Sequence, residues 1–146
     1  MRKKLAVLGW REYVDLPDLQ ISGVKAKIDT GAKTSCIHAF AVETFEKDNE
    51  VWVRFGVHPN QGDRVTEVWC ESRVVDYREV TDSGGHTEMR YVIASTLVIG
   101  RHVFEAEITL TNRDNMRFRM LLGRRAMKGR FAVNPGASYR QVKLSG

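Results

Sequence analysis

The feature that most constrains this chain is a two-residue alternation of apolar and polar side chains that recurs in short runs. Successive side chains of a β-strand point to opposite faces, so each run predicts a strand with one buried face. The runs, the first of them weaker than the rest, are residues 24–28, 51–57, 102–110 and 116–120, the last continuing into Leu121 and Leu122.

Turn-forming residues separate these runs at hairpin spacing, at residues 59–63, 82–85, 100–101 and 111–115. Helix candidates are short, one at Ala39–Lys47 and one at Arg124–Gly129. The length of 146 residues suits one domain. We therefore expect a single all-β domain over residues 1–146, a closed barrel or a folded-over sheet with one or two short helices.

Positive charge is concentrated in the last third of the chain. Residues 101–146 hold ten Lys or Arg and three acidic residues, a net charge of +7, whereas the whole chain carries +5. Such a segment indicates a polyanionic partner, either nucleic acid, an anionic surface or an acidic peptide, unless it is only a solvated face. Between residues 113 and 131 only Phe118 and Phe131 are aromatic, too few for the stacking platform of a nucleic-acid-binding domain. Nucleic acid is therefore the least favoured partner.

Signals for targeting and for disulfides are weak. The apolar run Leu5–Leu8 is shorter than the roughly 7–15 apolar residues of a signal peptide. No stretch approaches the roughly 20 apolar residues of a membrane span. Cys36 and Cys70 are too few for a disulfide scaffold and indicate reduced thiols. These features predict a soluble, cytoplasmic protein with no membrane partner.

One segment carries recognisable chemistry, residues 26–35, which read Ala-Lys-Ile-Asp-Thr-Gly-Ala-Lys-Thr-Ser. A strand there delivers the carboxylate of Asp29 into a tight turn, in which Thr30 can bond locally and Gly31 lets another backbone approach. Alone, Asp-Thr-Gly is a weak pattern that also fits a plain turn. Far downstream, residues 120–123 form a second apolar strand that ends in glycine before a helix-like stretch.

This pair of segments resembles the signature of the retropepsin-like aspartic peptidases, an apolar strand with Asp-Thr/Ser-Gly-Ala and a later apolar-apolar-Gly. Together with Gly9-Trp10-Arg11-Glu12 and Leu16-Pro17, residues 26–35 are similar to one bacterial branch of that family. Its members are commonly labelled ATP-dependent zinc proteases. Some are encoded beside a ligase that adds glutamates to a small-subunit ribosomal protein. The resemblance covers nearly the whole chain and implies the closed β-barrel of that family.

The resemblance also implies a role for each residue of the motif. Asp29 is the expected catalytic carboxylate, Thr30 braces the loop across a dimer, and Gly31 allows close approach of the substrate backbone. Residues 121–123 form the expected strand beside that loop. The turn at residues 82–86 sits where the family has its flap.

Aspartic peptidase chemistry requires two carboxylates, one ionised to activate water and one protonated to donate to the carbonyl oxygen. Two such groups about 3 Å apart share one proton and titrate as a pair. One Asp-Thr-Gly per chain supplies half of that site, so we expect a homodimer that joins Asp29 to its symmetry mate. Asp82-Ser83-Gly84 fits the same pattern, but its polar surroundings favour a hairpin tip.

The expected substrate contacts are basic. Viral members of the family usually have an acid at the position of Lys33, paired with the Arg that follows the apolar-apolar-Gly, here Arg124. The residues expected to contact substrate are Ala32, Lys33, Arg124 and Arg125. Guanidinium groups bind carboxylates, so this set predicts a carboxylate-rich peptide substrate. The resemblance to a branch encoded beside a glutamate ligase implies, more narrowly, a glutamate-rich substrate such as the tail of a glutamylated ribosomal protein. Alternatively, Arg124 pairs with an internal acid such as Asp76 or Glu79, and Lys33 is simply exposed.

Metal ligands are not evident despite the family label. The chain has no His-Glu-x-x-His and no Gly-rich phosphate loop, so we expect neither a metal nor another cofactor. Cys36 and His38 could be two zinc ligands on one strand face, with Cys70 as a third, but core packing of Cys36 and an ordinary polar role for His38 are favoured. Two alternatives stay open: a catalytically inactive peptide-binding or dimerisation module of the same fold, and a zinc-dependent peptidase.

Overall fold

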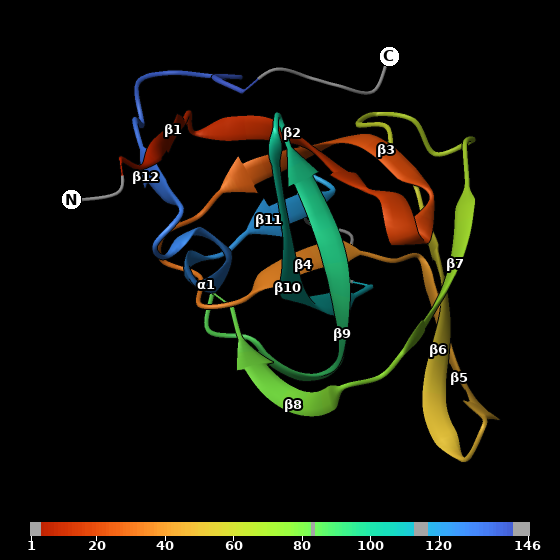
Figure 1. Ribbon diagram of the computed structural model, residues 1–146. Coiled ribbons are helices and arrows are strands. Elements are labelled where there is room, and N and C mark those ends of the chain that lie inside the picture. The colour runs from red at the N-terminus through yellow and green to blue at the C-terminus, as the bar shows by residue number, and fades with distance from the viewer. Residues whose placement is uncertain (1–3, 83, 113–116, 142–146) are drawn as a thin grey trace.

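The computed structural model describes residues 4–82, 84–112 and 117–141 (Figure 1). These residues form strands for the most part, with one turn of 3-10 helix and one short α-helix. The elements in chain order are β1 (Ala6–Leu8), β2 (Arg11–Leu16), η1 (Pro17–Leu19), β3 (Ile21–Ile28), β4 (Ser35–His38), β5 (Ala41–Lys47), β6 (Glu50–Val57), β7 (Val68–Arg73), β8 (Asp76–Thr81), β9 (Thr87–Ile99), β10 (His102–Thr111), β11 (Met120–Leu122), α1 (Arg124–Met127) and β12 (Phe131–Val133).

Six strands close into a barrel. The main sheet has the order β10-β4-β11-β3-β2-β9-β8, and β10 pairs again with β9, so the sheet closes on itself and β8 extends outward from β9. Strands β5, β6 and β7 form a separate antiparallel sheet, and β1 and β12 form a parallel pair. Figure 1 shows the β5–β6 hairpin and the β1–β12 pair on opposite sides of the barrel. The predicted all-β, closed-barrel fold is confirmed.

A single hydrophobic cluster connects the three sheets. Its largest fully buried side chains include Leu16, Leu97 and Ile108 from the barrel, Phe55 from β6 and Leu8 from β1. These residues lie on the apolar faces of alternating runs, as in β2, where every second residue from Glu12 to Leu16 is buried. The two-residue period therefore sorts side chains between core and solvent as expected.

The predicted strands are found where the alternation is clear. Residues 51–57 lie in β6, 102–110 in β10, 24–28 in β3, and Leu121 and Leu122 in β11. The run at 116–120 is largely wrong, because residues 117–119 form bends and only Met120 is a strand residue, while Met116 lies outside the described residues.

The predicted turns at residues 59–63 and 100–101 are confirmed, the former by a hydrogen bond from Asp63 N to the carbonyl of Asn60 (3.1 Å). In the turn predicted at 111–115, Thr111 is still part of β10, and residues 113–115 lie outside the described part of the chain.

The helix predicted at Ala39–Lys47 is wrong, because this segment contains strand β5. All seven residues of β5 pair with β6, with Phe45 opposite Trp52. Asp48 and Asn49 make the connecting turn with φ of 54° and 61°, a left-handed conformation that matches the twist of a tight hairpin. The helix predicted at Arg124–Gly129 is confirmed in a shorter form as α1. No helix among the described residues is long and apolar enough to cross a membrane.

Candidate active site

Asp29 follows directly after strand β3, and hydrogen bonds from both neighbouring segments fix the backbone at this point. Strand β11 runs parallel to β3 with Leu122 opposite Ile28, and the N–H of Asp29 donates to the carbonyl of Leu122 (2.9 Å). On the other side, the N–H of Ile28 donates to the carbonyl of Trp10 (2.9 Å). The predicted proximity of the two motif segments is therefore present in the structure.

The Asp29 carboxylate is oriented by its own loop. Its Oδ1 accepts hydrogen bonds from the N–H groups of Gly31 (3.0 Å) and Ala32 (3.2 Å). The Asp29 side chain is half-buried, whereas Thr30 and Gly31 are exposed. Among the described residues, none donates a hydrogen bond to Oδ2. One carboxylate oxygen of Asp29 is thus fixed by two backbone amides of its own loop.

The first two residues of α1 hydrogen bond to the same loop. The N–H groups of Arg124 and Arg125 donate to the carbonyls of Ala32 (2.7 Å) and Lys33 (3.1 Å). These bonds use amides that a helix leaves unpaired in its first turn. They also bring together the two separated segments that the sequence marks as substrate contacts.

Gly123 is the point at which the two segments touch. Its N–H donates to the hydroxyl of Ser35 (2.9 Å). A Cβ atom at this position would lie only 2.6 Å from the carbonyl carbon of Thr34, so no other residue fits without displacement. The glycine of the apolar-apolar-Gly pattern is thus explained by backbone contact.

The side chains of Lys33, Arg124 and Arg125 are exposed. Within the ranges that the structure describes, none of them forms an ion pair. Asp76 instead contacts Arg78 (2.9 Å), which also contacts Glu107 (2.9 Å). Asp76 and Glu79 are therefore not ion-pair partners of Arg124, although Lys33 is exposed as the same alternative has it.

The β8–β9 hairpin ends in a turn built around Asp82. The Asp82 Oδ1 accepts hydrogen bonds from the N–H groups of Gly84 (2.9 Å) and His86 (3.0 Å), while the N–H of Gly85 donates to the Asp82 carbonyl (3.0 Å). The hairpin tip expected here is confirmed, although Ser83 lies outside the described residues. The Asp82 carboxylate thus accepts the hydrogen bonds that shape this turn.

Both cysteines are core residues. Burial raises the pKa of Cys36 above its usual value, and burial raises the pKa of Cys70 to about 11. The Cys36 Sγ lies 3.4 Å from the Arg90 guanidinium, and the Cys70 thiol donates to the carbonyl of Leu19 (3.4 Å). Across the described ranges no three His, Cys, Asp or Glu side chains are grouped as a metal would need. The donor set expected of a zinc site is not assembled there.

Glu12 belongs to the Gly9–Glu12 stretch that carries part of the family resemblance, but the sequence does not predict its structural role. Its side chain is completely buried, and its carboxylate accepts hydrogen bonds from the N–H groups of Gly9 (2.6 Å), Arg140 (2.8 Å) and Gln141 (3.0 Å). A buried carboxylate is tolerated when several donors satisfy it. The available signal was an acid at a buried position of the β2 alternation, in line with Val14.

One family model and one solved structure match nearly the whole chain. The model of the RimB-like family, described as "Retropepsin-like aspartic endopeptidase RimB", matches residues 7–144. A crystal structure of a protein of unknown function from Legionella pneumophila is similar with a TM-score of 0.77 and 28% identity, covering 93% of this chain and 98% of that one.

The similar curated proteins are longer than this chain. A protein of Shewanella halifaxensis named "Probable alpha-L-glutamate ligase" is 45% identical over 133 residues, which is 91% of this chain and 29% of that protein. One of the same name from Desulfotalea psychrophila is 46% identical over 129 residues, 88% of this chain and 28% of that protein. The chain therefore spans less than a third of each of these relatives.

Proposed function

Because the chain belongs to the RimB-like family of retropepsin-like aspartic endopeptidases, we propose that it hydrolyses peptide bonds by an aspartic mechanism. The observation that carries this proposal is the Asp29 loop. A half-buried carboxylate with one oxygen held by two backbone amides sits beside an exposed Thr-Gly pair. That arrangement presents a fixed acid to a bound peptide.

The mechanism needs the Asp29 carboxylates of two copies of the chain. In the pair, one carboxylate is ionised and removes a proton from water, while the other is protonated and donates to the scissile carbonyl oxygen. The Gly31 and Ala32 amides stabilise negative charge on Oδ1. Since each chain supplies one Asp29, a homodimer completes the site, with Thr30 bracing the paired loops and Gly31 next to the substrate backbone.

The substrate we propose is an acidic peptide. Lys33, Arg124 and Arg125 carry exposed charges on segments that hydrogen bond to each other beside Asp29, and Ala32 lies between them and the acid. Several relatives that contain a similar segment are named glutamate ligases. A glutamate tail of the kind that such a ligase would add, for example on a ribosomal protein, fits these cations.

The test uses purified protein with glutamate-rich and glutamine-rich peptides of equal length, and product detection by mass spectrometry. We expect hydrolysis of the acidic peptide with a bell-shaped pH profile, because a shared proton must be present on one acid only. Asp29→Asn should lower kcat by at least about 10³-fold.

The matched control is Asp48→Asn at the tip of the β5–β6 hairpin, where Asn tolerates the left-handed backbone (φ 54°) as Asp does. Its activity should stay within about twofold of the unchanged protein. Full activity of a folded Asp29→Asn protein rules out the aspartic mechanism. Binding of the acidic peptide by the unchanged protein without any hydrolysis identifies a peptide-binding module instead.

A further inference from the structure

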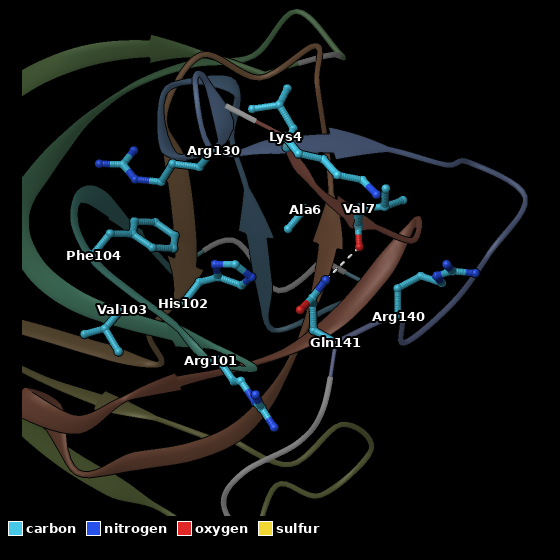
Figure 2. A pocket seen from close by; sticks show the side chains of 11 residues that line it. Lys4, Ala6, Val7, Arg101, His102, Val103, Phe104, Arg130, Arg140 and Gln141 are labelled. Atoms are coloured by element: carbon cyan, nitrogen blue, oxygen red, sulfur yellow. Dashed lines mark hydrogen bonds between the residues drawn. The ribbon is translucent and has the colours of Figure 1, made fainter. Parts of the chain in front are cut away.

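A second feature suited to acidic chains is a cavity of about 610 Å³ outside the Asp29 loop. We call it the cationic groove. No residue of the 29–33 segment lines it. Figure 2 shows the lining side chains coming from β1 and the residues before it, from Arg101 and the start of β10, from the turn after α1 and from the C-terminal segment. The lining residues are Lys4, Leu5, Ala6, Val7, Arg101, His102, Val103, Phe104, Arg130, Arg140 and Gln141.

The charge of the cationic groove has one sign. Lys4, Arg101, Arg130 and Arg140 line it and are exposed, and the lining includes no Asp or Glu. In the described part of the chain, none of these four cations has an ion-pair partner. Four like charges around one cavity repel each other, so an anionic occupant lowers their electrostatic energy.

The walls of the cationic groove are strand edges. Residues 4–7 and 102–104 line it consecutively, and consecutive lining residues mean that the cavity follows the edge of a strand rather than its face. Strand β1 pairs only with β12, and β10 pairs with β4 only from Ile108 onward. Main-chain groups of both edges are thus left without a strand partner among the described residues. Such edges accept an extended peptide as an added strand.

The Gln141 side chain forms a hydrogen bond with the edge of β1. The Gln141 side-chain amide donates to the carbonyl of Val7 (2.8 Å), drawn as a dashed line in Figure 2. An amide that lies in the cavity and bonds a β1 carbonyl shows that this edge accepts an amide donor from within the groove. A peptide backbone offers the same kind of donor.

Contacts within the chain fix both walls of the cationic groove in the absence of a ligand. Glu12 fixes the backbone of Arg140 and Gln141 through two hydrogen bonds. On the opposite wall, the Arg130 guanidinium lies over the Phe104 ring (4.7 Å), which packs against Phe131 (5.8 Å). Because the walls are pre-formed, less entropy is lost on binding. Phe104 is the one Phe, Tyr or Trp that lines the groove, and Arg130 lies over one face of its ring, so the groove has no row of open rings for base stacking and a peptide is favoured over a nucleic acid.

We propose that the cationic groove binds an extended acidic segment of the peptide substrate away from the bond that is cleaved. Carboxylates of that segment contact Lys4, Arg101, Arg130 and Arg140, and its backbone runs beside the β1 and β10 edges. The inference rests on the proposed function for the identity of the substrate. It adds a second contact site, which makes a long acidic chain a better ligand than a short one.

Direct binding tests the groove without catalysis. A fluorescein-labelled oligoglutamate peptide is titrated by anisotropy at low salt into protein carrying Asp29→Asn, so that the peptide is not consumed. Adding Arg101→Ala and Arg140→Ala should raise Kd by about tenfold or more. An oligoglutamine peptide of equal length should not bind measurably.

The matched control removes two positive charges elsewhere. Lys47→Ala with Arg54→Ala changes the β5–β6 hairpin, which lies on the other side of the barrel (Figure 1). Its Kd should stay within about twofold of the parent. An equal loss in both double variants overturns the groove proposal in favour of bulk charge attraction. Tighter binding of a single-stranded RNA than of the peptide overturns it in favour of a nucleic acid.

Kinetics separate this inference from the proposed function. In the background with Asp29 intact, the Arg101→Ala/Arg140→Ala protein should show a raised KM for a long acidic peptide and an unchanged kcat. Hydrolysis with an unchanged KM overturns the groove proposal and leaves the peptidase in place. Groove-dependent binding with no hydrolysis by the unchanged chain overturns the peptidase and leaves the groove in place. Melting curves of each variant confirm that it is folded.

Discussion

At the scale of single residues, the two thiols connect stability to pH. Burial holds the Cys70 pKa at about 11, compared with the ordinary value of 9.0, and the pKa of Cys36 is raised in the same direction. The folded chain therefore keeps a thiol proton at pH values where the unfolded chain has lost it. The difference between the folded and unfolded pKa values of Cys70 adds to the free energy of unfolding. This contribution is complete below pH 9 and is lost as pH rises toward 11.

We expect the Cys70 contribution to amount to roughly 2–3 kcal/mol over that range. Denaturant titrations at about pH 8 and about pH 10.5 check it by comparing the unchanged protein with Cys70→Ala. The unchanged protein should lose more stability between the two pH values than the variant does. Parallel losses in the two proteins would show that the thiol does not contribute.

At the scale of elements, the site depends on how closely β11 approaches the β3–β4 connection. Gly123 lies in backbone contact with Thr34, and the next two amides bond the loop that holds Asp29. The loop, the strand and the start of α1 thus behave as one unit. A small displacement of β11 moves the Asp29 backbone, because its N–H is bonded to Leu122.

Gly123→Ala should therefore reduce both stability and hydrolysis. The added methyl group meets backbone atoms of Thr34 that cannot rotate away, and overpacking of this kind costs about 1–3 kcal/mol. Thermal unfolding and kcat measurements check the prediction. Gly136→Ala is the control, because a Cβ there meets nothing closer than 3.5 Å. A Gly123→Ala protein as stable and active as that control contradicts the close-contact interpretation.

The elements differ in how readily the sequence predicts them. Alternation identified β6 and β10, since each keeps one apolar face along its length. The helix predicted at Ala39–Lys47 is wrong because distant partners decide the conformation of this segment. Phe40 stacks on His58 (4.4 Å), and Phe45 faces Trp52 across the hairpin. Local spacing of apolar residues carries no information about such contacts.

The functional features also differ in how readily the sequence predicts them. The Asp29 loop and Gly123 were predictable because each needs particular residue types at adjacent positions. Glu12 and the cationic groove were not, since their parts come from opposite ends of the chain. The Glu12 carboxylate bonds amides 128 and 129 residues away, and the basic bias of the last third does not reveal that Lys4 joins it.

At the scale of the whole molecule, the proposed catalytic unit is larger than one chain. Each copy supplies a single Asp29, so the fraction of complete sites follows the monomer–dimer equilibrium. We expect specific activity to fall on dilution, in parallel with the dimer fraction measured by sedimentation. Activity should also fall when increasing amounts of Asp29→Asn chain are mixed in, because mixed dimers contain one acid. Constant specific activity of a sedimenting monomer contradicts a site shared by two chains.

The pairing of β3 with β11 also sets an order of events during synthesis. Asp29 leaves the ribosome early, but the strand that fixes its loop ends at Leu122, and the amides that satisfy Glu12 belong to Arg140 and Gln141. Contacts between such distant residues form late and slowly in folding. A nascent chain thus carries the acid without the scaffold that orients it. The Asp29 loop therefore gains its contacts with β11 and α1 only after Arg125 has emerged, and Glu12 gains its partners only after Gln141, so a shorter nascent chain lacks the scaffold of the proposed site.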